Sequence, residues 1–480
     1  MVKTTNFVAL LLIVFPPLAS AGHMSGISAE IQNHWIGYLC LAIFVVAMLA
    51  VIAEEFIGMR KSKPMLISAG LIWGLIAVLA GQTGNSVEAE HAVRHNLLQY
   101  AELMLIMLVV MTYINAMSER QVFKTLQGWL GHRGYSHRHV FWVTGFASFF
   151  LSPVLDNLST ALLMGAVVMA VGKGNTRFIA LGCLNVILAS NAGGVFSPFG
   201  DITTLMVWQQ QIHSTNGLID FWTFFHLFPS ALVSYLIPAI AMHFAIPGGQ
   251  IEVPQRLIFM RRGAKRMMFL FLATIFTAVI FQSLLGLPGV IGILTGLSYL
   301  QIFGFYLKKT HRNLETLGID EEQLSVPVPV DGKEPFDIFI GVARAEWDTL
   351  LFLYGVLLSV GGLGYLGYLS LASDLMYHNL GPTTTNVYIG LVSSVLENIP
   401  TMSAVLAMAP EMASGQWLLV TLTTGIGGSI LSIGSAAGIA LMGQTKGIYT
   451  FFSHLKWTPF ILLGYIAAIE LHLQLNGGLF

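Results

Sequence analysis

The sequence predicts an all-α polytopic membrane protein: two inverted repeats, each with five transmembrane helices plus one re-entrant hairpin, and broken helices at mid-membrane. Composition is the first observation. The 480 residues are 55% hydrophobic and only 10% charged, whereas an ordinary soluble chain is about 25% charged. The second observation is that apolar stretches of roughly 20 residues, long enough to cross a bilayer, recur along the chain. The third is a polar motif that occurs once in each half.

The chain begins with the layout of a secretory signal peptide. Lys3 precedes an apolar run of about a dozen residues that ends in Ala-Ser-Ala. The run contains Pro16 and Pro17 and is short for a transmembrane span. We predict that 1–21 are a signal peptide cleaved after Ala21; the alternative is an uncleaved extra helix.

Further apolar stretches are long enough to cross a bilayer as helices. They are predicted at 36–53, 65–79, 97–116, 178–207, 221–245, 267–285, 288–306, 347–368, 417–442 and 457–473. Between the halves, 307–345 is predicted to be a cytoplasmic loop, because much of it is polar, acidic and interrupted by Pro.

Two more apolar segments, 140–171 and 387–409, do not fit as simple spans, because each carries Pro and adjacent polar residues at mid-depth. Irregular backbone at that depth is tolerated only where it lines a cavity or is buried in protein. We therefore predict two hairpins that enter the membrane and return on the same side.

The basic residues test this topology, because cytoplasmic loops of membrane proteins hold the excess of Lys and Arg. With the mature N-terminus outside and both hairpins re-entrant, all but Lys3, Arg94 and Lys456 of the 23 Lys and Arg residues fall on the cytoplasmic side. If either hairpin crossed the membrane, every later loop would change sides and the bias would disappear. The sequence thus predicts a multi-pass protein of the bacterial inner membrane with both mature termini periplasmic.

The two halves, 36–246 and 267–476, contain the same series of elements but begin on opposite sides of the membrane. They are therefore inverted with respect to each other. The motif S-x-V-L-[DE]-N-[LI]-x-T supports this relation, since it occurs over 152–160 and again over 393–401, at the middle of each hairpin.

A segment rich in Gly and Ser also interrupts one apolar span in each half, over 191–201 and 425–435. Such a break leaves carbonyl and N–H groups without helical partners. Unwound carbonyls and half-helix C-termini suit a hard cation such as Na⁺. Each hairpin tip adds a carboxylate and an Asn amide oxygen. The sequence therefore predicts sodium at Asp156, Asn157, Glu397 and Asn398.

A carboxylate near the bilayer centre costs about 2.5–3.5 kcal/mol or more, so an intramembrane acid is a functional candidate by default. This applies to Asp156, Asp201 and Glu397. The ion-binding candidates are these acids and the polar residues of the same motifs: Asp156, Asn157, Thr160, Asn191, Ser197, Asp201, Thr204, Glu397, Asn398, Thr401, Ser429, Ser432 and Ser435.

Acidic residues nearer the membrane ends are weaker candidates. Glu102 and Asp348 each lie about fifty residues before a hairpin tip and near the start of an apolar span, which makes them candidates for a proton pathway. The alternative is an interfacial acid. Glu54 and Glu55, which adjoin Arg60 and Lys61, are predicted to form a solvated helix end with them.

The halves differ at the interrupted spans, where Asp201 corresponds to Ser435. Grouped by half, the first site has two formal charges and the second has one: Asp156, Asn157 and Asp201 against Glu397, Asn398, Ser429 and Ser435. Close like charges favour the protonated form of one carboxyl group. We therefore expect the first site to carry the proton.

Several function classes find little support. A net charge of −1 without a concentrated basic face gives no reason to expect a nucleic-acid partner. Cys40 and Cys183 lie in apolar segments, so neither a disulfide framework nor a thiolate metal site is expected, and no cofactor is predicted. An intramembrane protease using Asp156 or Asp201 is an alternative, but it needs two acids at one scissile bond. Inverted repeats instead favour a transporter, not an enzyme.

Three stretches of the sequence are long and specific: S-P-V-L-D-N-L-S-T-A-L-L-M, N-A-G-G-V-F-S-P-F-G-D-I-T-T-L-M-V-W and L-E-N-I-P-T-M-S-A-V. Together they resemble NhaD-type sodium/proton antiporters of the ion transporter superfamily. The resemblance implies export of Na⁺ or Li⁺ in exchange for H⁺ by alternating access within the lipid bilayer. By analogy with the superfamily, it also suggests a homodimer.

The sequence departs from related sodium symporters, which carry Ser-Asn-Thr at each hairpin tip. Asn157 and Asn398 match that Asn, whereas Asp156 and Glu397 stand in place of the Ser and an apolar residue stands in place of the Thr. A carboxylate holds either Na⁺ or H⁺, so the departure agrees with a cation/proton exchanger. Na⁺-coupled symport of a dicarboxylate or other organic anion is the alternative, and the fixed negative charge argues against it.

Overall fold

The computed structural model describes residues 34–131, 136–172, 174–249, 259–311 and 335–480. The predicted signal peptide, 1–21, and most of the predicted loop 307–345 lie outside the described residues. Within the described part, the chain is helical apart from one short antiparallel pair, β1 (His213–Ser214) and β2 (Gly217–Leu218).

In the described residues, nine helical segments are long and apolar enough to cross a membrane. They are α3 (Trp35–Ile52), α5 (Ser62–Thr83), α6 (Ser86–Glu119), α10 (Thr176–Gly194), η1 with α12 (Thr223–His243), α13 (Ala264–Ser283), α14 (Gly289–Lys309), α17 (Trp347–Tyr365) and α24 (Thr458–Leu475). Each overlaps one predicted span. The remaining predicted span, 417–442, is divided into α21 (Ser414–Gly427) and α22 (Ala436–Gln444), which are each too short to cross alone.

Both interrupted spans appear in the structure as two helices separated by irregular backbone. The first break, 195–201, separates α10 from α11 (Ile202–Gln209), and the second break, 428–435, separates α21 from α22. Close backbone contacts explain the paired glycines. A Cβ at Gly194 would approach the carbonyl oxygen of Gly200, and a Cβ at Gly428 would approach that of Gly434, each at 2.7 Å.

Each predicted hairpin is a pair of helices that meet at the acidic residue of the motif. The first pair is α8 (His137–Leu155) with α9 (Asn157–Val171), and the second is α19 (Pro382–Leu396) with α20 (Asn398–Met408). We call Asp156 and Asn157 the first tip, and Glu397 and Asn398 the second tip. The helices of each pair pack against each other, as a hairpin requires.

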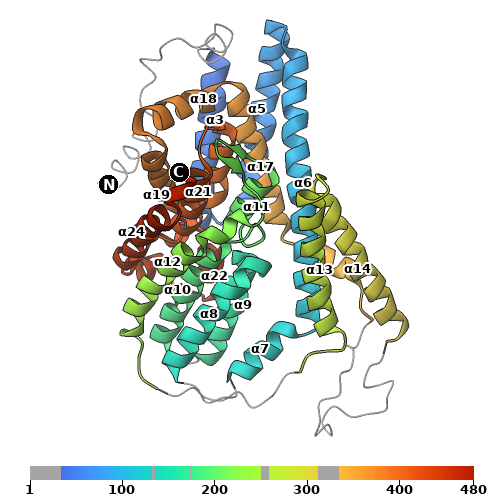
Figure 1. The fold of residues 1–480 in the computed structure, drawn as a ribbon, viewed down its shortest axis with the longest axis vertical. Helices are drawn as coiled ribbons and strands as arrows, with labels where there is room; N and C mark the ends of the chain where they lie inside the picture. Colours follow the sequence, from blue (N-terminus) through green and yellow to red (C-terminus); the bar gives the residue numbers. More distant parts are fainter. Residues whose placement is uncertain (1–33, 132–135, 173, 250–258, 312–334) are drawn as a thin grey trace.

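The same packing pairs recur in the two halves. Helix α3 packs on α5 as α13 packs on α14, and α8 packs on α10 as α19 packs on α21. The last long helices of the two halves, α12 and α24, lie side by side (Figure 1). Contacts also cross between halves, because α22 of the second half packs on α9, whereas α11 of the first half packs on α20. The second half of each broken helix therefore lies against the hairpin of the other half.

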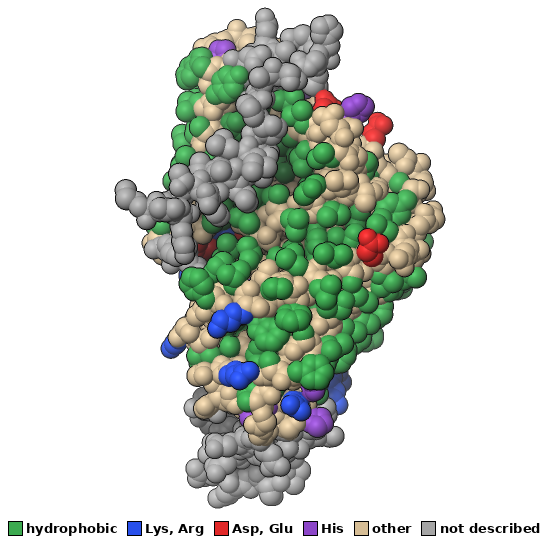
Figure 2. Space-filling model, turned by 90° about the vertical axis from the view of Figure 1, so that its left-hand side faces the viewer, with side chains coloured by type: hydrophobic (Ala, Val, Ile, Leu, Met, Phe, Trp, Pro, Cys, Tyr) green, Lys and Arg blue, Asp and Glu red, His purple; other side chains and the backbone are tan. Residues whose placement is uncertain are grey.

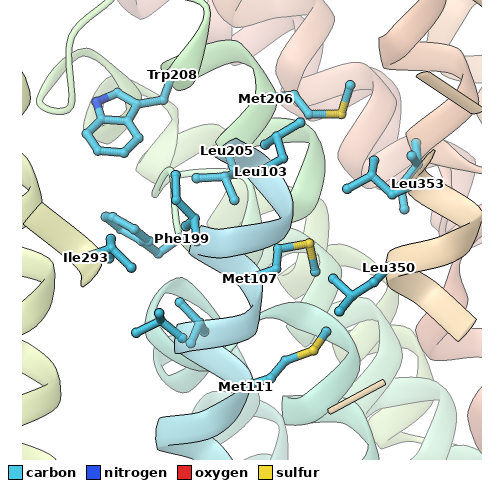
Figure 3. Close-up of a cluster of buried hydrophobic side chains, with 14 of the residues drawn as sticks. Leu103, Met107, Met111, Phe199, Leu205, Met206, Trp208, Ile293, Leu350 and Leu353 are labelled. Carbon is cyan, nitrogen blue, oxygen red and sulfur yellow. The ribbon is translucent and has the colours of Figure 1, made fainter. Parts of the chain in front are cut away.

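Helix α6 links the two halves through an apolar core. It is longer than predicted and packs on α14, α16 and α17 of the second half as well as on α11. Figure 3 shows its Leu103 and Met107 between Phe199 on one side and Leu350 and Leu353 of α17 on the other. These five side chains are buried. This core fixes the position of the first break relative to α17.

Shorter elements complete the described chain. They are α4 (Glu54–Ile57), α7 (Val122–Gly131), α16 (Ile338–Ala343), α18 (Tyr368–Ser373), η3 (Asp374–His378), η4 (Ser432–Gly434), α23 (Phe451–Leu455) and η5 (Gly477–Leu479). Large hydrophobic side chains are exposed on most of the long helices, as expected where helices face lipid. Figure 2 shows hydrophobic side chains across most of one face, with most of the visible Lys and Arg in its lower half and the visible Asp and Glu higher.

Candidate functional site

Both hairpin tips hold an acidic residue in a backbone conformation that normally requires glycine. Asp156 has φ 66° and ψ 160°, and Glu397 has φ 70° and ψ 154°. A residue with a Cβ in this region costs about 1–3 kcal/mol, and such strain clusters at functional sites. The shared conformation places each carboxylate at the N-terminus of the returning helix, α9 or α20.

Local donors hold the carboxylate of the first tip. The backbone N–H of Ser159 donates to Asp156 Oδ1 and its hydroxyl donates to Oδ2, both at 2.8 Å. Asp156 is only partly buried, whereas Asn157 is buried. The negative charges of Asp201 and Glu346 also act on Asp156. Glu346 precedes α17 and was not among the predicted site residues.

A chain of buried amides joins the first tip to the end of α10 and to the second break. Asn157 Nδ2 donates to Asn191 Oδ1 at 3.2 Å, and Asn191 Nδ2 donates to the Ser429 hydroxyl at 2.7 Å. Asn191 lies near the end of α10 and Ser429 lies in the second break. Predicted ligands that are far apart in the sequence are therefore connected directly.

Asp201 joins the first break to the second tip. Its Oδ2 accepts a hydrogen bond from Asn398 Nδ2 at 2.8 Å. Its Oδ1 accepts the backbone N–H of Thr203 at 3.4 Å, and Thr204 completes a capping box at the start of α11. Asp201 is 3% exposed and Asn398 is 3% exposed, so this pair is removed from solvent.

The predicted division of the site by halves is wrong. Asp201 was grouped with Asn157 and Ser429 was grouped with Asn398, but the structure pairs Asp201 with Asn398 and connects Ser429 to Asn157 through Asn191. The physical reason is the crossed packing, since α11 lies on α20 and α22 lies on α9. The two predicted sites are thus parts of one polar centre at which both halves meet.

The hydroxyl candidates fall into two groups. Thr160 and Ser432 are buried, and their hydroxyl oxygens have no hydrogen-bond partner among the described residues. A buried unpaired hydroxyl is costly, so these two oxygens are suited to a ligand. The other hydroxyls have structural partners: Ser197 donates to Pro153 O, Thr204 to Asp201 O, Thr401 to Glu397 O, and Ser435 caps α22 by accepting the N–H of Gly438.

The Glu397 side chain forms a buried ion pair that the sequence did not suggest. Lys61 Nζ lies 2.7 Å from Glu397 Oε1, and the side chains are 8% and 4% exposed. The expectation that Lys61 belongs to a solvated helix end is wrong, because the start of α5 packs against α17 instead of facing solvent. The sequence did not indicate this ion pair because Lys61 lies between two exposed basic residues, Arg60 and Lys63, and all three fit the positive-inside pattern. The prediction that Glu397 binds sodium stays a prediction.

Glu102 and Asp348 have partners on different helices. Glu102 Oε2 accepts a hydrogen bond from Gln209 Nε2 at the end of α11, at 2.7 Å. Asp348 accepts a hydrogen bond from the Ser62 hydroxyl, directly after Lys61. Neither is bonded to a hairpin tip in the described structure, so their role in a proton pathway stays a prediction.

The assembled groups can bind a small hard cation. They offer carboxylate, amide and hydroxyl oxygens, together with irregular backbone whose carbonyls lie at the two breaks. Hard cations prefer such oxygen ligands. Carboxylates can also take up a proton, so the same groups can hold either ion.

Comparisons with known proteins agree over most of the chain. The citrate transporter family (CitMHS) matches residues 40–425. The chain is 53% identical to the Na⁺/H⁺ antiporter NhaD of Alkalimonas amylolytica, over 94% of this chain and 93% of that one. It is 50% identical to the Na⁺/H⁺ antiporter NhaD of Vibrio cholerae serotype O1, over 98% and 99%, and 48% identical to that of Halomonas elongata, over 98% and 94%.

Proposed function

This chain belongs to the NhaD-type sodium/proton antiporters within the citrate transporter family, and from that membership we propose how its polar centre exchanges the two ions. It is a multi-pass membrane protein and a secondary active antiporter that moves Na⁺ in exchange for H⁺. In our proposal it exports cytoplasmic Na⁺, or Li⁺, and the inward proton gradient drives the exchange.

The observation that carries the mechanism is the polar centre in which each tip is joined to the break of the other half. Asp201 bonds Asn398 of the second tip, and Asn157 of the first tip is connected to Ser429. Asp156 and Asp201 both belong to the first half, but Asn398 of the second half bonds Asp201, so a cation held between the two carboxylates would lie where the halves meet. A proton on either carboxyl group lowers its attraction for Na⁺, so the two ions compete for one set of oxygens.

We infer that the halves are inverted repeats that alternate access to this centre. The paired motifs, the recurring packing pairs and the matching tip conformations support the inference. Both hairpins would be re-entrant, with the protein in a bacterial inner membrane and its basic loops in the cytoplasm. A homodimer follows only from analogy with the superfamily, and no cofactor is required.

Two other functions fit the site less well. Symport of a dicarboxylate, which the name of the wider family suggests, needs donors for an anion, whereas Asp156 and Asp201 place negative charge at the centre without a lysine or arginine partner among the described residues. An intramembrane protease needs two acids on one scissile bond. Here Asp201 is bonded to Asn398 and to the start of α11, and Asp156 is bonded to Ser159.

Everted membrane vesicles test the proposed function. A respiration-driven pH gradient is established, and NaCl or LiCl is then added. Antiport predicts that either salt dissipates the gradient, because Na⁺ or Li⁺ enters the vesicle as protons leave. If neither ion changes the gradient, and the same vesicles take up a dicarboxylate with Na⁺, the chain is a symporter and our proposal is wrong.

A further inference from the structure

The two tips share a backbone conformation but hold their carboxylates differently. Ser159 gives Asp156 two hydrogen bonds at 2.8 Å, one from its N–H and one from its hydroxyl. The motif places Pro400 at the corresponding position after Glu397, and proline has neither group to donate. No side-chain hydrogen bond caps α20. The Glu397 carboxylate therefore lacks the local donors that hold Asp156.

A lysine supplies the missing partner. Lys61 Nζ lies 2.7 Å from Glu397 Oε1 and 4.5 Å from the centre of the Phe352 ring, on α17. Among the ion pairs of the described residues, this is the pair in which both side chains are less than 10% exposed. Asp156 forms no ion pair within the same described residues. The second tip is thus paired with a cation that is part of the chain itself, the Lys61 ammonium, whereas the first tip is not.

The surroundings of Lys61 favour a cation at this place. Glu54 interacts electrostatically with Lys61, Glu397 and Asp348, and Glu346 interacts with Lys61 and Asp348. A small cavity lined by Glu54, Lys61 and Glu397 lies at the contact. Of these four carboxylates Glu397 is buried and the other three are partly buried, so their negative charge requires compensation by positive charge. An ammonium group and a sodium ion each provide one positive charge to carboxylate oxygens.

We propose that the Lys61 ammonium is a tethered cation that occupies the ion position of the second tip, so that the chain binds one exchangeable Na⁺, at the first tip. The proposal rests on the antiport function proposed above and assigns its binding stoichiometry. Glu397 is then a partner of Lys61 and not a ligand of transported sodium. The pair fixes the second tip to α5 and α17, while the first tip keeps its carboxylate for Na⁺ or H⁺.

The test is a count of bound sodium. Equilibrium binding of ²²Na⁺ to the purified full-length protein should give one site per chain. Lys61→Met removes the ammonium and keeps an apolar chain over Phe352, so Glu397 becomes free for Na⁺ and the count should rise to two. Lys61→Met combined with Glu397→Gln removes both charges and should return the count to one. Lys63→Met, an exposed lysine two residues away, is the matched control and should leave the count at one.

The outcomes separate the two proposals. A wild-type count of two overturns the Lys61 assignment without any variant, and so does a count of one in a folded Lys61→Met protein. Size-exclusion profiles in detergent establish that each variant is folded. If the wild-type protein binds no Na⁺ and everted vesicles show no exchange, the antiport function fails. If exchange is present but the counts disagree with this scheme, only the role of Lys61 fails.

Discussion

Single residues at the tips combine a charge with a strained backbone. Asp156 and Glu397 adopt positive φ values that glycine adopts without penalty. A sequence under selection for stability alone would place glycine there. The retention of an acid at both positions, at a cost in free energy of unfolding, is explained if the carboxylates act on the transported ion or, at Glu397, on Lys61.

The strain itself can be measured at Asp156. Asp156→Gly and Asp156→Ala both remove the carboxylate and its bonds to Ser159, so they differ only in backbone preference. Relief of the strain should stabilise the Gly variant by about 1–3 kcal/mol. The greater conformational entropy that glycine loses on folding offsets about 0.5–1 kcal/mol of this gain. In a denaturation series in detergent, we expect the free energy of unfolding of the Gly variant to be about 1 kcal/mol larger than that of the Ala variant. Both variants should lose exchange. Equal stabilities would show that the tip is not strained.

Asp201 offers a separate test of charge. Asn at this position keeps one acceptor oxygen for the cap of α11, and its amide N–H can donate to Asn398 once the Asn398 amide turns to present its oxygen, so Asp201→Asn should fold normally. The loss of the negative charge should lower Na⁺/H⁺ exchange in vesicles by about tenfold or more. Asp220→Asn is the matched control, because Asp220 likewise accepts a backbone N–H at the start of a helical segment, from Thr223, but forms no hydrogen bond to the polar centre. Normal exchange and an unchanged pH profile in Asp201→Asn would leave Asp201 as a helix cap only.

At the scale of elements, glycines allow the hairpins to lie directly on the broken helices. A Cβ at Gly193 of α10 would collide with the carbonyl oxygen of Phe149 in α8. A Cβ at Gly427 of α21 would collide with the carbonyl oxygen of Gly390 in α19. The same close approach at corresponding places explains why both halves keep a Gly-Gly pair at the end of the first half-helix.

Alanine substitution tests this packing. Gly427→Ala should destabilise the protein by about 1–3 kcal/mol, since backbone must move to admit one methyl group. Gly443→Ala, in the helix α22, meets no atom within 4 Å and serves as the control. Thermal unfolding followed by fluorescence-detected size exclusion compares the two. Equal midpoints for Gly427→Ala and Gly443→Ala would refute the close approach.

The positions of the helices and breaks were easier to predict from the sequence than the contacts between them. The spans, hairpins and breaks follow from apolar length and from Pro, Gly and Ser placement, which are local signals. The pairing of Asp201 with Asn398 depends on which broken helix lies against which hairpin, and no local pattern records that. Lys61 was missed for a related reason, because a basic residue beside α5 satisfies the positive-inside rule whether it is buried or exposed.

For the whole molecule, the basic loops predict the orientation in the membrane. Cys40 and Cys183 are fully buried, so they should give little background in thiol labelling. Phe259→Cys, at an exposed position before Arg261 and Arg262, should resist an impermeant thiol reagent added to intact cells and react in everted vesicles. Phe480→Cys, at the exposed C-terminus, should give the opposite result. Labelling of residue 259 from outside intact cells would show that the predicted orientation is wrong.

The most direct test of the whole account is ion exchange by the purified protein in proteoliposomes that contain a pH indicator. With no other gradient, external ²²Na⁺ should enter and the lumen should become alkaline in step with it. Asp156→Asn and Asp201→Asn should each reduce both signals by about tenfold or more, because each removes one of the carboxylates for which Na⁺ and H⁺ compete. Entry of ²²Na⁺ without a change in lumenal pH, or only when a dicarboxylate is present, would contradict the account.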